Sequence, residues 1–248
     1  MKRMRPAAAA GRLAIVALSA IVLASCAEPS YEYVRNTDVR AAFKIPTGWA
    51  AYSKEEVLGL GSGPTANTPD PIAWLVGLDG DPNPSVSHVL NRNDLAGDHP
   101  QGVVLVQDLS FLERDGANIN YLRNYIFPVD QLIQDDSDAQ VLAYDDGVER
   151  EGFRGVHLEY QFREAALASV GQADPSVQTA TESDLQRALL GGSGVGVLSP
   201  DFVQVNQTAY LDPTSNRLYL MAIMCSAECY ARNRGDISAA VDSWTVLP

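Results

Sequence analysis

Two pairs of strand-like segments, each joined by a short polar turn, limit most strongly what this chain can fold into. The first pair is QVLAYDDGVER and FRGVHLEYQF; the second is FVQVNQTAYL and RLYLMAIMC, with Asp212–Asn216 between them. Segments joined by so short a turn pair antiparallel. Before Phe162, apolar residues alternate with His157, Glu159 and Gln161, which predicts one buried face and one solvated face.

Further strand-like segments precede these hairpins. Two short apolar runs bounded by turn residues, Ile72–Leu78 and Gly102–Ser110, are typical of strands. The stretch AAFKIPTGWAAYS predicts a strand, a Pro-x-Gly turn and a strand that returns beside the first. Because the strands come mostly in hairpins with few crossover helices, the sheet is expected to be largely antiparallel.

Two regions carry a helical pattern. Apolar spacing over Asn118–Ile133 predicts a helix that Pro128 interrupts or bends. A terminal helix is expected to follow Cys225 and to run to about Trp244, because four residues there define one apolar face: Ile237, Ala240, Val241 and Trp244. The predicted fold class is α+β, a largely antiparallel sheet packed against helices.

The N-terminal segment has the features of a bacterial lipoprotein signal peptide. A positively charged start precedes a short apolar run, Leu13–Ala24, about half the length that spans a bilayer. The residues Leu23-Ala24-Ser25 before Cys26 match the lipobox pattern, which implies cleavage before Cys26 and a lipid on its sulfur. Acyl chains of the palmitate type would hold the protein durably on a membrane. The alternative is an ordinary secretory signal with a chance cysteine at its end.

These features divide the chain into three parts. Residues 1–25 are expected to be removed as the signal peptide, and residues 26–36 to form a short lipidated tether. Residues 37–248 are expected to form a single α+β domain. A flexible excursion is predicted within it at about 164–200, where small and polar residues lead to GGSGVG.

The charge of the chain excludes some classes of partner. The whole chain carries a formal net charge of −13. Removing residues 1–25 would leave 14 basic and 31 acidic residues, a formal charge of −17. Such a surface repels nucleic acid and anionic lipid headgroups, so membrane attachment is expected to depend on the lipid at Cys26.

The remaining two cysteines, Cys225 and Cys229, are expected to form a structural disulfide. With Cys26 lipidated, they are an even pair in an oxidising, extracytoplasmic setting. Zinc would need two further ligands, and no histidine lies nearby in sequence. A thioredoxin-like centre has two residues between its cysteines, whereas this pair has three. We therefore expect the pair to fix a strand-to-helix corner, with a metal or redox role as the alternative.

No sequence motif predicts a catalytic residue, a metal ligand or a cofactor. Around Ser193 the chain has GGSGV, which lacks the last glycine and the preceding strand of a hydrolase elbow. The glycines at 59, 61 and 63 lack the Gly-Lys-Ser/Thr of a phosphate loop. Asp79–Asn83 resembles the start of a calcium loop, but Pro84 and Leu90 occupy the positions that need Gly and Glu.

Three weaker candidates remain. His157 and Glu159 share a strand face and could begin a metal site, although a solvated face accounts for them. Arg234-Gly-Asp236 spells an integrin-binding tripeptide, but it falls inside the predicted terminal helix. Six aromatic residues are either core residues or the lining of a groove beneath the 164–200 excursion: Trp49, Tyr52, Trp74, Tyr121, Tyr125 and Phe127.

Three segments together resemble a known family. The FKIPTGW segment, the RLYLMAIMC strand and the closing VDSWTV resemble actinobacterial envelope lipoproteins with the PsbP-like fold, of the LpqN type. The resemblance implies an antiparallel sheet packed between helices, an α/β/α sandwich, and scaffolding or binding in place of catalysis. It transfers no functional residue, because the matching residues are structural.

The expected function is therefore that of a lipid-anchored, non-catalytic protein on the extracytoplasmic face of the cell membrane. It would bind or assemble an envelope protein, or present a lipid or glycan ligand. A lipid or glycolipid carrier with an apolar pocket is the first alternative. A hydrolase whose catalytic pair comes from distant sequence positions is the second.

Overall fold

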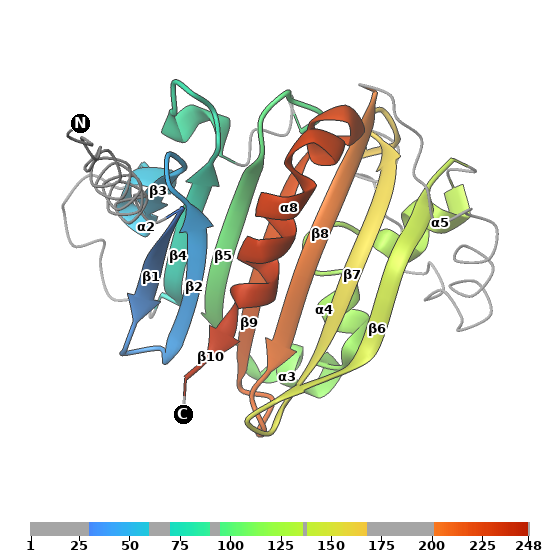
Figure 1. Cartoon of the computed structure of the whole chain (residues 1–248). Helices are drawn as coiled ribbons and strands as arrows, with labels where there is room; N and C mark the ends of the chain where they lie inside the picture. The colour runs from blue at the N-terminus through green and yellow to red at the C-terminus, as the bar shows by residue number, and fades with distance from the viewer. Residues whose placement is uncertain (1–29, 60–69, 90–94, 136–137, 168–200, 248) are drawn as a thin grey trace, which may run out of the picture.

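The computed structural model describes residues 30–59, 70–89, 95–135, 138–167 and 201–247. Two antiparallel sheets and a few helices make up this part of the chain (Figure 1). The seven-stranded sheet has the order β3-β4-β5-β9-β8-β7-β6, and the three-stranded sheet has the order β1-β2-β10. The α+β class and the largely antiparallel pairing predicted from the sequence are confirmed.

The large sheet consists of seven strands with these bounds: β3 (Ala50–Ser53), β4 (Ile72–Asp79), β5 (Gln101–Asp108), β6 (Gln140–Arg150), β7 (Phe153–Arg163), β8 (Phe202–Leu211) and β9 (Arg217–Ser226). Both predicted hairpins are present, β6 with β7 and β8 with β9. Alternation along the sequence places side chains on opposite faces of a strand, and this local signal was sufficient to predict the pairs.

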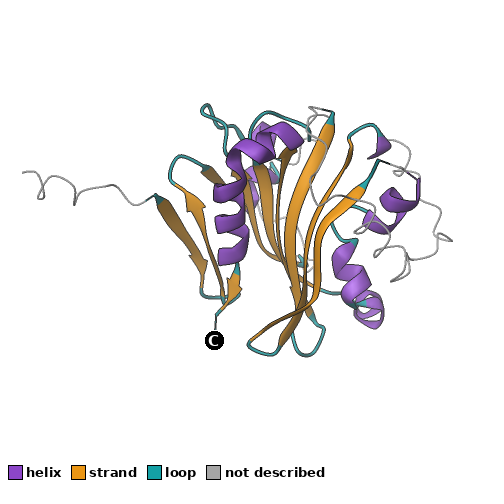
Figure 2. Ribbon diagram, turned by 45° about the vertical axis from the view of Figure 1, so that its right-hand side comes forward, coloured by secondary structure: helices purple, strands orange, loops and turns teal. Residues whose placement is uncertain are grey.

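Different layers cover the two faces of the large sheet. One face carries the three-stranded sheet, formed by β1 (Tyr31–Asn36), β2 (Ala41–Pro46) and β10 (Thr245–Val246), together with α8 (Ala227–Ser243) (Figures 1 and 2). The other face carries three short helices: α3 (Phe111–Gly116), α4 (Ile119–Arg123) and α5 (Val129–Asp135). A helix of four residues, α2 (Lys54–Val57), follows β3, and a 3-10 turn, η1 (Val86–His88), follows β4.

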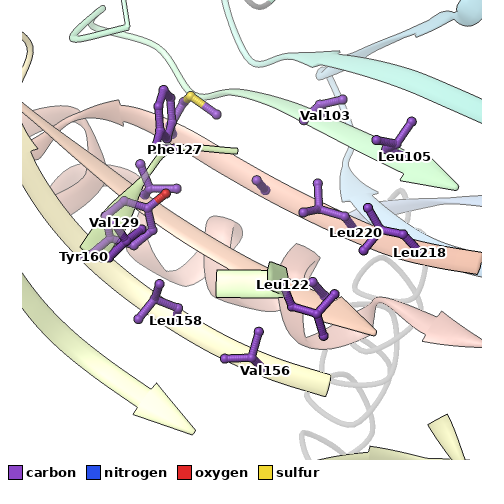
Figure 3. Close-up of a cluster of buried hydrophobic side chains, with 14 of the residues drawn as sticks. Val103, Leu105, Leu122, Phe127, Val129, Val156, Leu158, Tyr160, Leu218 and Leu220 are labelled. Carbon is purple, nitrogen blue, oxygen red and sulfur yellow. The ribbon is translucent and has the colours of Figure 1, made fainter. Parts of the chain in front are cut away.

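Each face of the large sheet has its own apolar core. Beneath α4 and α5, Leu122, Phe127 and Val129 pack against strand residues such as Leu158 and Leu220 (Figure 3). On the opposite face, Phe43 of β2 and Trp244 pack against residues of β4, β5 and β9, among them Val104 and Met221. The second core joins the two sheets, because residues of both contribute to it.

The predicted helical regions are present with changed bounds. The pattern over Asn118–Ile133 corresponds to α4 and α5, and Pro128 directly precedes α5, where its missing N–H breaks no helical hydrogen bond. The apolar stripe of α8 is buried as predicted. Helix α3 was missed, although its signal is present: Ser110 and Glu113 form a capping box at its start.

Two predictions about the N-terminal strands were wrong. The strands on either side of Pro46-Thr-Gly48 do not pair with each other, because β2 belongs to the small sheet and β3 pairs with β4 in the large one. Gly48, at φ 101°, allows the chain to pass between the sheets there. Residues Tyr31–Asn36, expected within a tether, form β1 and pair along their whole length with β2.

The solvated face predicted for β7 is also corrected. His157 is partly exposed, but Glu159 and Gln161 are buried. Glu159 accepts a hydrogen bond from Gln204 Nε2 at 2.7 Å, and Tyr230 of α8 lies close to this part of the sheet. Polar residues thus face a covered region here, which alternation alone does not distinguish from solvent.

Candidate binding surface

A groove opens where the small sheet lies beside the edge of the large one. Its volume is about 370 Å³. One wall is Val34 of β1, and the remaining lining residues come from Ala51–Glu55, which spans the end of β3 and the start of α2, and from Ala73–Val76 of β4. Both β1 and β3 are the outer strands of their sheets, so the groove lies between two sheet edges.

The rim of the groove is fixed by a helix cap and an ion pair. Ser53 accepts a hydrogen bond from the Glu56 N–H, and the Glu56 carboxylate accepts one from the Ser53 N–H at 2.7 Å. This capping box ends β3 after four residues and begins α2. Lys54 forms an ion pair with Asp70 and donates to the Ile72 carbonyl at 2.5 Å. The hydrogen bond from Lys54 lowers the pKa of Asp70.

Trp74 connects the groove to the core that joins the sheets. Its ring centroid lies 5.8 Å from that of Phe43 and 6.4 Å from that of Trp244. Tyr52 of β3 lines the same groove and is partly buried. The surface therefore combines an aromatic floor with a fixed Lys–Asp pair at its rim, which suits a peptide or a sugar better than a long acyl chain.

The six aromatic residues proposed as a groove lining do not meet in one place. Tyr52 and Trp74 line this groove, whereas Tyr121 and Tyr125 pack against the core on the opposite face of the large sheet. Phe127 is buried in that same core. Trp49 packs close to Gly80 and does not line the groove. These residues are divided between the two faces of the large sheet and do not line one common groove; Phe127 is a core residue, the alternative that the sequence left open.

A second groove of about 480 Å³ lies at the end of the strands where several turns meet. Most of its lining residues are charged or polar: Asp38, Val39, Arg40, Asp108, Glu151, Phe153, Asp212, Pro213, Asn216, Arg217 and Tyr219. Arg217 Nε donates to Asp108 Oδ1 at 2.6 Å, and Arg40 Nε donates to the Leu247 carbonyl at 3.0 Å. These cations thus already have partners.

The proposed calcium loop is a hydrogen-bonded turn around Asp79. The Asp79 carboxylate is buried and accepts from the Asp81 N–H at 2.9 Å, from the Ser85 N–H at 2.8 Å and from His88 Nδ1 at 2.8 Å. Both of its oxygens therefore serve to hold the loop 80–88. Within the part of the chain that the structure describes, no group of three His, Cys, Asp or Glu side chains could hold a metal ion.

The other candidates of the sequence are accounted for where the structure describes them. His157 Nδ1 lies 2.9 Å from Thr208 Oγ1, a partner on the neighbouring strand. Arg234-Gly-Asp236 lies within α8, as predicted. Cys26, Ser193, the glycines at 61 and 63, and nearly all of the 164–200 excursion lie outside the described residues.

Cys225 and Cys229 form a disulfide, as predicted. Cys225 belongs to the end of β9 and Cys229 to the first turn of α8, so the bond closes the strand-to-helix corner. Both residues are fully buried. Ser226 caps the helix from the same corner by accepting from the Cys229 N–H at 3.2 Å.

Comparison with known proteins identifies similar solved structures only. No family model matches the chain, and no curated protein matches it. The fold is similar to cyanobacterial PsbP (CyanoP) from Synechocystis sp. PCC 6803, with 11% identity, 90% of this chain and 95% of that chain covered, and a TM-score of 0.40. It is also similar to the Ran-binding protein Mog1p of Saccharomyces cerevisiae, with 8% identity, coverages of 88% and 95%, and a TM-score of 0.42. A PsbP protein is thus among the structures whose fold this chain resembles.

Proposed function

We propose that this chain is a lipid-anchored, non-catalytic envelope protein that binds or assembles a partner on the extracytoplasmic side of the cell membrane. The observation that carries the proposal is the lipobox Leu23-Ala24-Ser25-Cys26, placed directly after a basic segment and a short apolar run. None of the helices among the described residues is long and apolar enough to cross a membrane. In this proposal the lipid on Cys26, which the lipobox implies, holds the protein on the membrane.

The structure supports a short connection between the anchor and the domain. β1 begins at Tyr31, five positions after Cys26. Because an extended chain spans at most about 3.5 Å per residue, the start of β1 would lie within roughly 20 Å of the lipidated residue. The groove lined by Val34 of the same strand would then lie near the membrane.

A binding role is supported by the character of the groove. Tyr52 and Trp74 provide aromatic contact area, and the fixed Lys54–Asp70 pair provides polar contacts at the rim. The ligand class that fits is an extended peptide of an envelope protein or a glycan. A carrier of lipid or glycolipid is the alternative, and it requires an apolar cavity larger than this groove of about 370 Å³.

Substituting Cys26→Ala tests the anchor. In cells, the wild-type chain should incorporate labelled palmitate and partition with the membrane, whereas the variant should do neither. The matched control is the double variant Cys225→Ala/Cys229→Ala, which removes the other two cysteines and should stay in the membrane fraction. Membrane partition of Cys26→Ala equal to that of the wild type would show that the lipobox assignment is wrong.

Native mass spectrometry of the protein purified from its own host tests the binding role. A bound glycan or peptide that is lost in Tyr52→Ala, but retained in Phe111→Ala, would support the groove; Phe111 is an exposed aromatic residue on another part of the surface. A bound lipid in its place would favour the carrier. Retention of the ligand by Tyr52→Ala would show that the ligand binds outside this groove.

A further inference from the structure

The two sheets have four edge strands among the described residues, and three of them carry features that discourage pairing. β10 has only two residues, and β3 has four. The β3 edge is also closed at Ser53, whose N–H is taken by Glu56. β6 is interrupted by two register shifts and exposes Asp145 and Asp146. Natural proteins protect sheet edges by such means, because an unpaired edge is a template for another strand.

β1 exposes Glu32 and Arg35, but it lacks the other protections. It is six residues long, contains no proline, and keeps an unbroken register with β2 from Tyr31 to Asn36. In the view of Figure 2, β1 is the outermost described strand on its side of the molecule. Tyr33 on this strand is 83% exposed, the largest exposed fraction among the big apolar side chains of the described residues. An exposed, regular strand with an aromatic residue at its centre indicates an interface.

The hydrogen bonds of β2 show which groups of β1 point outward. The Thr47 N–H donates to the Ser30 carbonyl at 3.0 Å, so residue 30 and every second residue after it bond to β2. The Lys44 N–H, opposite Tyr33, donates away from β1 to Ser243 Oγ at 2.9 Å. Pro46, opposite Tyr31, has no N–H to donate.

The backbone groups of Tyr31, Tyr33 and Arg35 therefore point away from β2. Within the described part of the chain, no hydrogen bond engages these outward N–H and C=O groups. They are spaced two residues apart, which is the repeat of an antiparallel ladder. A second strand could pair with all three of these residues without disturbing the existing sheet.

We propose that β1 pairs antiparallel with β1 of a second copy of this chain, about a two-fold axis at Tyr33. This register places Tyr31 opposite Arg35 of the second copy and Tyr33 opposite itself, so that all three outward residues of both strands are paired. An arginine beside a tyrosine ring and two facing tyrosines are both favourable cross-strand pairs. Glu32 would lie opposite Val34, so no like charges face each other.

Neighbouring registers are less suitable. A shift in one direction places Glu32 directly opposite Glu32 of the second copy, and like charges in that position repel. A shift in the other direction places Tyr31 opposite Thr37, which belongs to the turn after β1. The self-complementary register is thus selected by the strand's own residues, and the inference does not depend on the proposed anchor.

Disulfide cross-linking tests both the pairing and its register. The full chain is used in a Cys26→Ser background, where Cys225 and Cys229 are already joined and buried. Tyr33→Cys should give a disulfide-linked dimer on mild oxidation, because facing Cα atoms in this kind of pair lie about 5.5 Å apart. Arg35→Cys is the matched control, since its two copies would be about 14 Å apart and out of reach.

A mixture of two variants adds a positive test of register. Chains with Tyr31→Cys and chains with Arg35→Cys should form a mixed disulfide, because these positions face each other in the proposed pairing. Cross-linking of Arg35→Cys alone to the same extent as Tyr33→Cys, or no linked dimer from Tyr33→Cys, would overturn the inference.

A proline variant tests the same strand without cross-linking. Tyr33→Pro removes an outward N–H only, so the β1–β2 ladder should persist and the melting temperature should change little. Sedimentation should show the wild-type chain at twice its 26.7 kDa mass and the proline variant at the monomer mass. A wild-type chain that remains monomeric at about 0.1 mM would also overturn the inference. A Kd above this concentration corresponds to a binding free energy weaker than about −5.5 kcal/mol. If Tyr33→Pro then abolished binding of an extended partner peptide, the outer edge of β1 would bind a different protein and not a second copy of this chain.

Discussion

Arg123 and Asp130 form a two-point salt bridge inside the protein, with Nε donating to Oδ1 at 2.7 Å and Nη2 donating to Oδ2 at 2.8 Å. The two residues are only 2% and 5% exposed. Arg123 ends α4 and Asp130 lies in α5, so the pair ties the two short helices together. Burial alone would lower the pKa of Arg123, but the hydrogen bonds and charge of Asp130 raise it, which keeps the guanidinium charged.

Removing one partner of this pair should destabilise the protein strongly. Asp130→Ala leaves the Arg123 charge buried without its carboxylate, and such losses cost about 3–5 kcal/mol. The matched control is Asp138→Ala, which breaks the more exposed ion pair with Arg163 and should cost at most about 1 kcal/mol. Urea denaturation of both variants measures the difference in the free energy of unfolding. Equal effects of the two substitutions would contradict a structural role for the buried pair.

Two glycines should respond to alanine with opposite signs. A Cβ on Gly155 of β7 would lie 2.4 Å from Tyr210 Cδ1 and 2.5 Å from the Ala209 carbonyl oxygen. Gly155→Ala should therefore cost about 1–3 kcal/mol through overpacking. Gly235, within α8, has no atom within 4 Å of such a Cβ, and Gly235→Ala should stabilise the helix by up to about 1 kcal/mol. Thermal melts compare the two, and stabilisation by Gly155→Ala would contradict the contact with Tyr210.

Local patterns in the sequence were sufficient to predict most of the fold. The alternation in β7, the turn before β9 and the apolar stripe of α8 are each contained within a few consecutive residues. The partner of a strand is a longer-range property. Nothing near Pro46 shows that β2 and β3 join different sheets, and the polar residues of β1 conceal a strand whose Val34 packs against the core.

The candidate groove was only partly predictable for the same reason. Tyr52 and Trp74 were among the aromatic residues considered, but Val34 and Lys54 were not. The groove forms because β1 of the small sheet lies beside β3 of the large sheet, and no local sequence pattern predicts that these two strands come together. The turn at Asp79 was easier to predict from the sequence, because the three groups that bond to its carboxylate belong to Asp81, Ser85 and His88, all within the next nine residues.

The disulfide at the strand-to-helix corner should make a modest contribution to stability. On the chain-entropy model, a loop as short as Cys225–Cys229 stabilises by about 2 kcal/mol. The double variant Cys225→Ala/Cys229→Ala should lose about that amount in urea denaturation while keeping its circular dichroism spectrum. Intact mass of the wild-type protein without reductant should be two hydrogens below the reduced value. Alkylation of both cysteines in the unreduced, denatured protein would contradict the disulfide.

Tyr160 should link the stability of the protein to alkaline pH. Its hydroxyl is buried and donates to Gln207 Oε1 at 3.3 Å, and burial raises its pKa well above 10. In the unfolded chain the pKa of tyrosine is about 10. Because the folded state favours the protonated form, the contribution of Tyr160 is fully present below about pH 10 and is lost as pH rises towards its folded pKa.

Ionisation of the buried tyrosine should therefore coincide with unfolding. Absorbance near 295 nm follows tyrosinate and far-ultraviolet circular dichroism follows the fold. Part of the absorbance change should occur only in the pH range where the dichroism is lost. Tyr160→Phe should move the midpoint of alkaline unfolding to higher pH, because it removes a hydroxyl that the folded state keeps protonated. Complete titration of all tyrosines near pH 10 with the dichroism intact would contradict the burial of Tyr160.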